Sequence, residues 1–325
     1  MLRTAMGLAI GAALADPLVI EIMVNPDGVL RLDRLGEGRI DTGERLEPAQ
    51  IERIVRLVAS HARTEVHGEA PIVSAELPPH AEGRAGERFE GVLPPVSTGP
   101  CFSIRKPAER LYTLADYVTD GIMSEAAADR LRAAVTQRFN ILVAGGTSSG
   151  KTTLANALLA EMAWIDERII LIEDTRELQS PAADTVALRT RSGNASGAGI
   201  VTMADLVRST LRLRPDRIIV GEVRGGEALD MLKAWNTGHP GGIATVHANS
   251  AKSALYRIEQ LVQEAVVTVP RRLIAEAIDL IVFISGRGLQ RRVSSIARVA
   301  GVDPDGGYGL VELLDPDPSQ PLQGE

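Results

Sequence analysis

The second half of the chain, from Arg138 onward, alternates short apolar runs with segments of helical periodicity. Each run is too brief for a buried helix and lacks polar alternation, which is typical of a strand buried on both faces. Helices between such strands favour a mostly parallel sheet covered on both sides, and therefore an α/β fold. The predicted strands are Ile141–Ala144, Ile169–Ile172, Ile218–Val220, Ile243–Val246 and Ile278–Ile284, with Arg291–Val299 as a further one.

The N-terminal third follows a different pattern, in which short strands are separated by turn residues. Val19–Val24 is interpreted as a strand, Asn25-Pro26-Asp27-Gly28 as a turn, and Val29–Leu32 as the returning strand. Pro48 begins a helix whose apolar residues recur with the 3.6-residue period. A further short strand near Phe89–Leu93 lies in a stretch rich in proline and glycine. This pattern predicts a separate α+β domain.

The extreme N-terminus carries an uncharged, alanine-rich run that permits two interpretations. Ala13-Leu14-Ala15 before Asp16 resembles the small-residue cleavage site of a short signal peptide. The apolar residues of Leu2–Ala15 also recur at helical spacing, so a first helix packed on a partner surface is the favoured interpretation. No run reaches the ~20 apolar residues that a membrane-spanning helix needs, so any membrane association would be peripheral.

The length of 325 residues suggests two domains, at about 150 residues per domain. Two helical patches, Leu114–Val118 and Ser124–Val135, lie between the two patterns, and Ser124 is placed to cap the second patch. We interpret this stretch as a connector. The expected organisation is an N-terminal domain over residues 1–105, a helical connector over 106–137, a second domain over 138–290, and a partly disordered C-terminal extension over 291–325.

The amino-acid composition argues against nucleic acid as a binding partner. The formal net charge is −7 and only 3% of residues are aromatic. An acidic chain with few stacking side chains lacks the features that drive binding to nucleic acid, so direct nucleic-acid binding is not expected. The single cysteine, Cys101, permits no intramolecular disulfide, which fits a reducing, cytoplasmic compartment.

The strongest motif matches the pattern G-x-x-x-x-G-K-[ST], lying between a predicted strand and a predicted helix over Thr152–Met162. Glycines allow the loop to turn successive N–H groups toward phosphate oxygens, and the helix start adds its positive dipole end. Lys151 then reaches the β and γ phosphates, and the Thr152 hydroxyl reaches Mg²⁺. We therefore expect ATP and Mg²⁺ as cofactors. The residues expected to bind the nucleotide are Gly145, Gly146, Thr147, Ser148, Ser149, Gly150, Lys151, Thr152 and Thr153.

Acidic side chains follow two of the predicted strands. Glu173 comes directly after Ile169–Ile172, and Glu222 follows Ile218–Val220 after Gly221. Because the carboxyl ends of parallel strands line the ligand crevice, both carboxylates can face the same γ-phosphate. One can position Mg²⁺, directly or through water and together with Thr152, while the other orients or deprotonates the attacking water. Gly221 departs from the commonest P-loop pattern, which has an aspartate there.

His239 and His247 straddle the predicted strand Ile243–Val246 and leave three interpretations open. Zinc would need a third ligand, and no HExxH motif, cysteine pair or nearby acidic ligand supplies one. Either histidine could be a hydrogen-bonded structural residue. His247 could instead lie near the γ-phosphate and sense the nucleotide state through a charge-assisted hydrogen bond, which is the interpretation given most weight.

These motifs, in this order, closely resemble the hexameric secretion ATPases of type IV secretion, type II secretion and retraction pili. The resemblance covers essentially the whole chain. It also implies that Gly221 is no exception, because a glycine before the glutamate is normal in the acidic strand of that family. Two N-terminal motifs look like the conjugal-transfer branch. The stretches that carry the resemblance are residues 145–152, 171–178, 213–225 and 238–250, with Asp16-Pro17, residues 21–28 and residues 102–107 for the branch.

The resemblance implies a ring, usually a homo-hexamer, with a PAS-like N-terminal domain, a RecA-like P-loop NTPase core and nucleotide between them. It implies that Glu173 and Glu222 are the catalytic carboxylates beside Lys151, and that His247 belongs to the family's histidine box. Arg105 matches an N-terminal arginine that reaches phosphate. Weaker candidates for contacts across a subunit boundary are Arg189 and Arg191.

The expected function is that of an ATP-hydrolysing motor of a secretion or conjugation apparatus. The resemblance places it in the cytoplasm, with peripheral contact at the inner membrane and with inner-membrane channel components as partners. Two alternatives stay open: a RecA-like nucleic-acid motor, and a nucleotide-gated scaffold that binds ATP with little turnover. The set Lys151, Thr152, Glu173 and Glu222 favours turnover.

Overall fold

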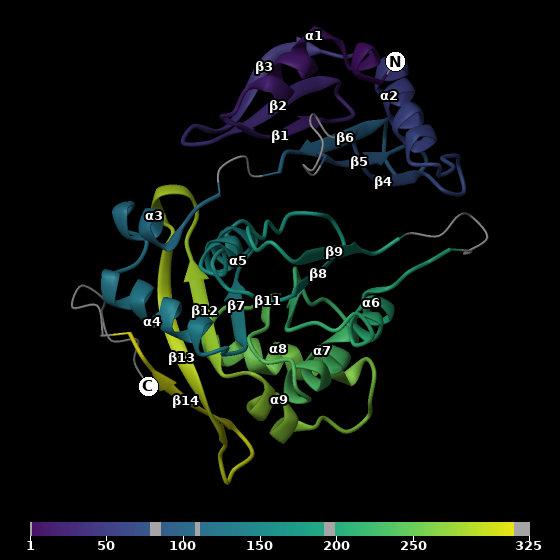
Figure 1. The fold of residues 1–325 in the computed structure, drawn as a ribbon. Coiled ribbons are helices and arrows are strands. Elements are labelled where there is room, and N and C mark those ends of the chain that lie inside the picture. The colour runs from purple at the N-terminus through teal and green to yellow at the C-terminus, as the bar shows by residue number, and fades with distance from the viewer. Residues whose placement is uncertain (1, 79–85, 108–110, 192–198, 315–325) are drawn as a thin grey trace. The chain divides into compact units, whose positions relative to one another are not determined.

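The computed structural model describes residues 2–78, 86–107, 111–191 and 199–314. The chain divides into two compact units (Figure 1). The N-terminal unit comprises residues 1–110, with residues 175–177 and 191–201. The C-terminal unit comprises the remaining residues, 111–174, 178–190 and 202–325.

The N-terminal unit is a six-stranded antiparallel sheet with the order β3-β2-β1-β6-β5-β4, against which two helices pack. Its core joins buried residues of the sheet to Ile10 of the first helix and Ile54 of the second. This arrangement confirms the predicted small α+β domain and shows that its sheet is antiparallel. The elements are α1 (Leu2–Ala15), β1 (Val19–Val24), β2 (Val29–Arg34), β3 (Gly38–Arg45), α2 (Pro48–His61), β4 (Ile72–Glu76), β5 (Arg88–Val92) and β6 (Cys101–Arg105).

Local sequence explains the predicted parts of this unit. Helix α1 has the expected bounds and packs on the core through Met6 and Ile10, although Gly7 interrupts its helical backbone at φ 79°. Gly28 has φ +76°, and a β-carbon there would lie 2.5 Å from the Leu46 carbonyl oxygen, so the turn after β1 requires glycine. No helix in the described ranges is long and apolar enough to cross a membrane.

The C-terminal unit is built on an eight-stranded sheet with the order β14-β13-β12-β7-β11-β10-β8-β9. The six strands from β12 to β9 run parallel, and the β13 and β14 pairings are antiparallel. This confirms the mostly parallel sheet. The strands are β7 (Ile141–Gly145), β8 (Ile169–Glu173), β9 (Thr185–Arg189), β10 (Arg217–Val220), β11 (Ile243–His247), β12 (Leu280–Ser285), β13 (Arg292–Val302) and β14 (Tyr308–Glu312).

Helices cover both faces of this sheet (Figure 1). On one face, Ile141 and Val143 pack with residues of α3, α4 and α5. The alternate residues Leu142 and Ala144 are also buried, and α7 and α8 contact the central strands. Burial on both faces is the reason these strands read as unbroken apolar runs. The helices are α3 (Leu114–Thr119), α4 (Glu125–Thr136), α5 (Lys151–Ala160), α6 (Met203–Thr210), α7 (Glu227–Asn236), α8 (Ala251–Gln263) and α9 (Arg271–Ala277).

The stretch interpreted as a connector contains α3 and α4. The Ser124 hydroxyl accepts a hydrogen bond from the Ala127 N–H at 3.2 Å, as a helix cap should. Both helices contribute buried residues to the core of the C-terminal unit. The domain boundaries expected at residues 105, 137 and 290 stay predictions. The expected disorder at the C-terminus falls in part on residues 315–325, which lie outside the described residues.

Candidate nucleotide site

The phosphate-binding motif forms a loop between β7 and α5, as the sequence predicts. Two of its residues have left-handed backbone conformations, Ser148 at φ 61° and Gly150 at φ 96°. Such conformations turn successive N–H groups toward a common concavity, which binds anions at the start of the following helix. A β-carbon on Gly145 would lie 2.5 Å from both the Ile284 carbonyl oxygen and Ser149 Oγ. Glycine is therefore required where the loop leaves the sheet.

Lys151 is the first residue of α5 and only 7% exposed. Its ammonium donates a hydrogen bond to the Gly146 carbonyl oxygen at 3.1 Å, so the side chain folds back over the loop. The same Nζ lies 3.4 Å from each ring nitrogen of His247, at the end of β11. The structure thus brings together the loop lysine and His247, the histidine of the segment 238–250.

His247 connects this lysine to a carboxylate on another strand. Its Nε2 lies 3.3 Å from Oε1 of Glu222, which follows β10. Arg224 holds the same carboxylate in a two-point contact, from Nε to Oε1 at 2.8 Å and from Nη2 to Oε2 at 3.0 Å. The fork geometry of guanidinium fixes the orientation of a carboxylate better than a single charge does. Arg224 lies within the stretch 213–225 that carries the family resemblance, but no role was assigned to it from the sequence.

The charges of this cluster set the protonation states. Burial alone would raise the pKa of the Glu222 carboxyl, but the hydrogen bonds and charge of Arg224, with His247 and Lys151 nearby, lower that pKa below its usual range. Burial, and then the positive charge of Lys151, lower the pKa of His247, against the opposing effect of Glu222. Near neutral pH the carboxylate is therefore ionised and the imidazole is mainly neutral.

Glu173, the other predicted carboxylate, ends strand β8 and is 3% exposed. Its Oε1 accepts a hydrogen bond from the Leu178 N–H at 2.8 Å. A β-carbon on Gly221 would lie 3.0 Å from Glu173 Cγ and 3.3 Å from its Oε1. A side chain at position 221 would therefore crowd Glu173 on the neighbouring strand, which favours the glycine that departs from the commonest pattern.

The remaining predicted residues lie apart from this cluster. His239 has its Nδ1 3.0 Å from the Pro215 carbonyl oxygen, a structural role. Arg189 is exposed at the end of β9, where strand register aligns it with Glu173. Arg191 and Arg105 belong to the N-terminal unit, so their expected phosphate and interface contacts stay predictions.

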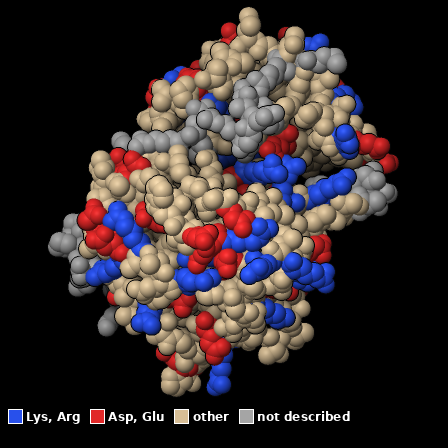
Figure 2. Space-filling view, viewed as in Figure 1, with Lys and Arg blue, Asp and Glu red and all other residues tan. Residues whose placement is uncertain are grey.

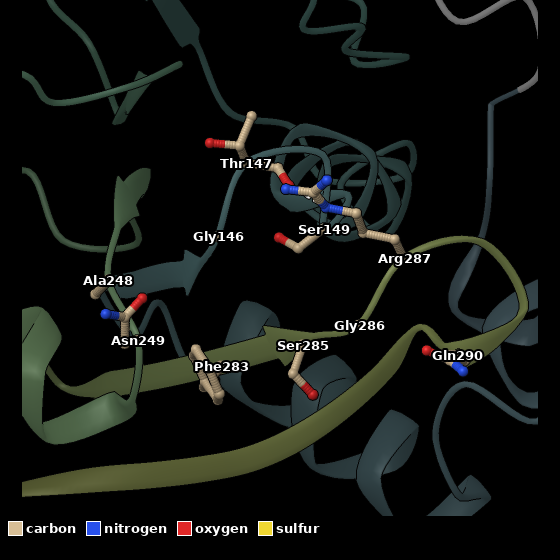
Figure 3. Close-up of a pocket in the computed structure, with 10 residues that line it drawn as sticks. All are labelled: Gly146, Thr147, Ser149, Ala248, Asn249, Phe283, Ser285, Gly286, Arg287 and Gln290. Atoms are coloured by element: carbon tan, nitrogen blue, oxygen red, sulfur yellow. Dashed lines mark hydrogen bonds between the residues drawn. The ribbon is translucent and has the colours of Figure 1, made fainter. Parts of the chain in front are cut away.

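A cavity of about 370 Å³ opens beside the loop (Figure 3). Its walls come from the phosphate-binding loop, the segment before α8, and the end of β12 with the turn that follows. Sequence reasoning missed the β12 side, because these residues lie far along the chain and only the pairing of β12 with β7 brings them to the loop. The lining residues are Gly146, Thr147, Ser149, Ala248, Asn249, Phe283, Ser285, Gly286, Arg287 and Gln290.

The fold and the loop define a P-loop NTPase domain with carboxylates at the ends of neighbouring parallel strands. The sequence model of one family, described as Type II/IV secretion system protein, matches residues 45–301. The chain belongs to this family.

Individual relatives agree with this assignment. The chain is 49% identical to the conjugal transfer protein TrbB of Rhizobium radiobacter over 302 residues, which are 92% of this chain and 90% of that protein. It is 36% identical to the type IV secretion system protein PtlH of Bordetella pertussis, over 86% of this chain and 89% of that one. Its fold is similar to that of the pilus retraction motor PilT with bound ADP, with a TM-score of 0.60 at 21% identity over 94% of this chain and 80% of the other.

Proposed function

We propose that this protein hydrolyses ATP to ADP and phosphate and that the reaction powers a type IV secretion or conjugation apparatus. The observation that carries the proposal is the contact series from Lys151 through His247 to Glu222, which joins the phosphate-binding loop to an ionised carboxylate. A loop that only bound nucleotide would not need a base at this place. Relatives named for conjugal transfer and type IV secretion support the biological setting.

The roles follow from position and charge. Loop N–H groups and Lys151 bind the β and γ phosphates. Glu222 is ionised and accepts the proton of the attacking water, with Arg224 fixing the orientation of its carboxylate. His247 accepts a hydrogen bond in its neutral form and senses the γ-phosphate from the end of β11. Arg105, in the N-terminal unit, adds a contact to phosphate.

The residues also fit Mg²⁺. The Thr152 hydroxyl and the carboxylates of Glu173 and Glu222 form a set of oxygen donors, which is the chemistry that this small, hard cation prefers. Bound there, Mg²⁺ neutralises charge that develops on the transferred phosphoryl group. Glu173 is buried and its Oε1 accepts the Leu178 N–H, so with Glu222 it would hold the ion directly or through water.

The proposal extends to the assembly. The protein forms a homo-hexameric ring at the cytoplasmic side of the inner membrane and contacts inner-membrane components of the channel. The described surface mixes basic and acidic side chains over the C-terminal unit, without a field of one sign on the face shown (Figure 2). This pattern, together with the net charge of −7, favours protein partners over nucleic acid.

The test is Mg²⁺-dependent phosphate release by the purified protein, compared with Lys151→Ala. The parent should turn over ATP, and the variant should lose turnover while its far-UV circular dichroism stays unchanged. The exposed Lys252→Ala is a matched control that should behave as the parent. A parent that binds ATP in a well-folded oligomer but releases no phosphate would instead be a nucleotide-gated scaffold.

A further inference from the structure

The turn that joins β12 to β13, residues 286–291, lies directly against the phosphate-binding loop. Strand β12 pairs in parallel with β7, which places Ile284 beside Gly145. The turn is tight: Gly286 has φ +74°, and a β-carbon there would lie 2.0 Å from the Gln290 carbonyl oxygen. Only glycine fits this position, so the turn has a defined shape rather than an adaptable one.

Two arginines of this turn reach the loop at different points. The Nε of Arg287 donates a hydrogen bond to the Thr147 carbonyl oxygen at 3.1 Å, and Figure 3 shows its guanidinium next to Thr147. Arg291 packs against Gly150, where a β-carbon would lie 2.9 Å from its Nε and 3.0 Å from its Cζ. The turn therefore contacts the loop at Thr147, before Ser148, and at Gly150, after it.

Ser148 is the strained residue of the loop. It is not glycine, yet it has a left-handed backbone at φ 61°. Such a residue persists only when the surrounding structure fixes it. The hydrogen bond to the Thr147 carbonyl oxygen just before it, and the packing on Gly150 two residues after it, supply that constraint.

The charges of these arginines are not neutralised by carboxylates within the described residues. Neither forms an ion pair there, and the Nε of Arg291 is buried without a hydrogen-bond partner, as is Ser149 Oγ. The sheet order puts β12 on one side of β7, and the strands that carry Glu173 and Glu222 on the other. Positive charge therefore gathers on the β12 side of the anion-binding loop.

We propose that Arg287 and Arg291 are positioning residues of the nucleotide site. They hold the phosphate-binding loop in its left-handed conformation and add positive charge beside the polyphosphate of the nucleotide. The inference rests on the proposed function, since it assumes that the loop binds a nucleoside polyphosphate.

The experiment measures the dissociation constant of Mg-ADP by calorimetry, and KM and kcat for ATP, in the full-length protein. Arg291→Gln should weaken ADP binding about ten-fold, the size expected for one lost contact to a charged group. Arg287→Gln should act in the same direction, and Arg291→Lys, which keeps the charge but not the planar fork, should fall between parent and Arg291→Gln. The neighbouring Arg292 is exposed, so Arg292→Gln is the matched control with the same change in net charge.

A positioning role predicts a raised KM with kcat nearly retained at saturating ATP, and an unchanged melting temperature. A merely structural role would lower the melting temperature instead, and that result would overturn the inference. Arg291→Gln with the affinity of the parent would also overturn it, as would an equal loss in Arg292→Gln. If the parent itself fails to bind Mg-ADP, the proposed function fails, and that outcome is distinguishable from all of these.

Discussion

Glu173 and Gly221 fit together across two parallel strands, so closely that a β-carbon at position 221 would require Glu173 to shift by a few tenths of an ångström. A β-carbon on Gly221 would stand 3.0 Å from Cγ of Glu173. No left-handed backbone is involved at Gly221, so the constraint is one of space alone. The buried carboxylate side chain on β8 therefore crowds any side chain at position 221, which favours glycine there.

This relationship predicts that Gly221→Ala and Glu173→Ala are coupled. In the parent background the added methyl group should destabilise the protein by about 1–3 kcal/mol, as overpacking does. In the Glu173→Ala background the same methyl group should fit, so the double-mutant cycle should show a coupling of about 0.5–3 kcal/mol. Denaturant unfolding of the four proteins measures it. Additive effects would contradict the packing argument.

The second prediction concerns Glu222. Glu222→Gln keeps the size of the side chain but removes the charge, so ATP should still bind while its hydrolysis slows by about 10²–10⁴-fold, as for a lost general base. Single-turnover assays should show ATP retained on the protein. The exposed Glu276→Gln is the control with the same chemical change. If ATP affinity collapsed while turnover of bound ATP survived, Glu222 would be a binding group instead.

The third prediction concerns the titration of His247. Burial and the charge of Lys151 lower its pKa, while Glu222 opposes them. In the nucleotide-free protein its ring should therefore titrate below the usual value of about 6.5. Glu222→Gln removes the opposing carboxylate and should lower this pKa further, whereas Lys151→Ala removes the ammonium and should raise it.

Nuclear magnetic resonance of the ring protons measures these pKa values, and His247→Gln identifies the resonance. Because the folded pKa is lower than the unfolded one, the unfolded chain binds more protons below about pH 6.5. The contribution of His247 to stability is thus present above that pH and is lost as the pH falls. A ring that titrates above 6.5 in the parent would contradict the geometry described for this site.

How far the sequence predicts the fold depends on burial. Strands β8 and β11 were predicted within one residue, because burial on both faces leaves an unbroken apolar run. Strand β9 was missed, since it lies at the sheet edge and its side chains are half-buried or exposed. Strand β3 was missed for the same reason, because it is largely exposed at the edge of its sheet.

The residues of the candidate site also fall into two groups, those that the sequence predicted and those that it did not. The sequence predicts Lys151 from the phosphate-binding motif, Glu222 from its place after a buried strand, and His247 from its place at the end of another. Arg224 and Arg287 also follow buried strands, but no role was assigned to either, since their contacts depend on where a turn places a long side chain. The fold as a whole decides where a long, charged side chain lies, so a local sequence pattern cannot predict its contacts.

The last prediction is that full activity requires a ring. Arg189 is exposed beside the carboxylate strand β8, on the edge strand of the sheet, where a neighbouring subunit can approach it. An arginine supplied across an interface can stabilise charge on the transferred phosphoryl group, so a lone subunit should be a poor enzyme. The specific ATPase rate should therefore rise with protein concentration and reach a plateau where light scattering reports the assembled oligomer.

Mixed rings distinguish a shared site from a self-contained one. Adding the double variant Arg189→Ala, Arg191→Ala to the parent should lower the rate more than dilution does, because each variant subunit then also impairs a parent neighbour. The double variant Arg272→Ala, Arg298→Ala removes two exposed arginines elsewhere on the C-terminal unit and should act only as a diluent would, or not at all. A rate per subunit that stays constant down to a monomeric concentration would refute the shared site, since catalysis would then need only the groups of one chain.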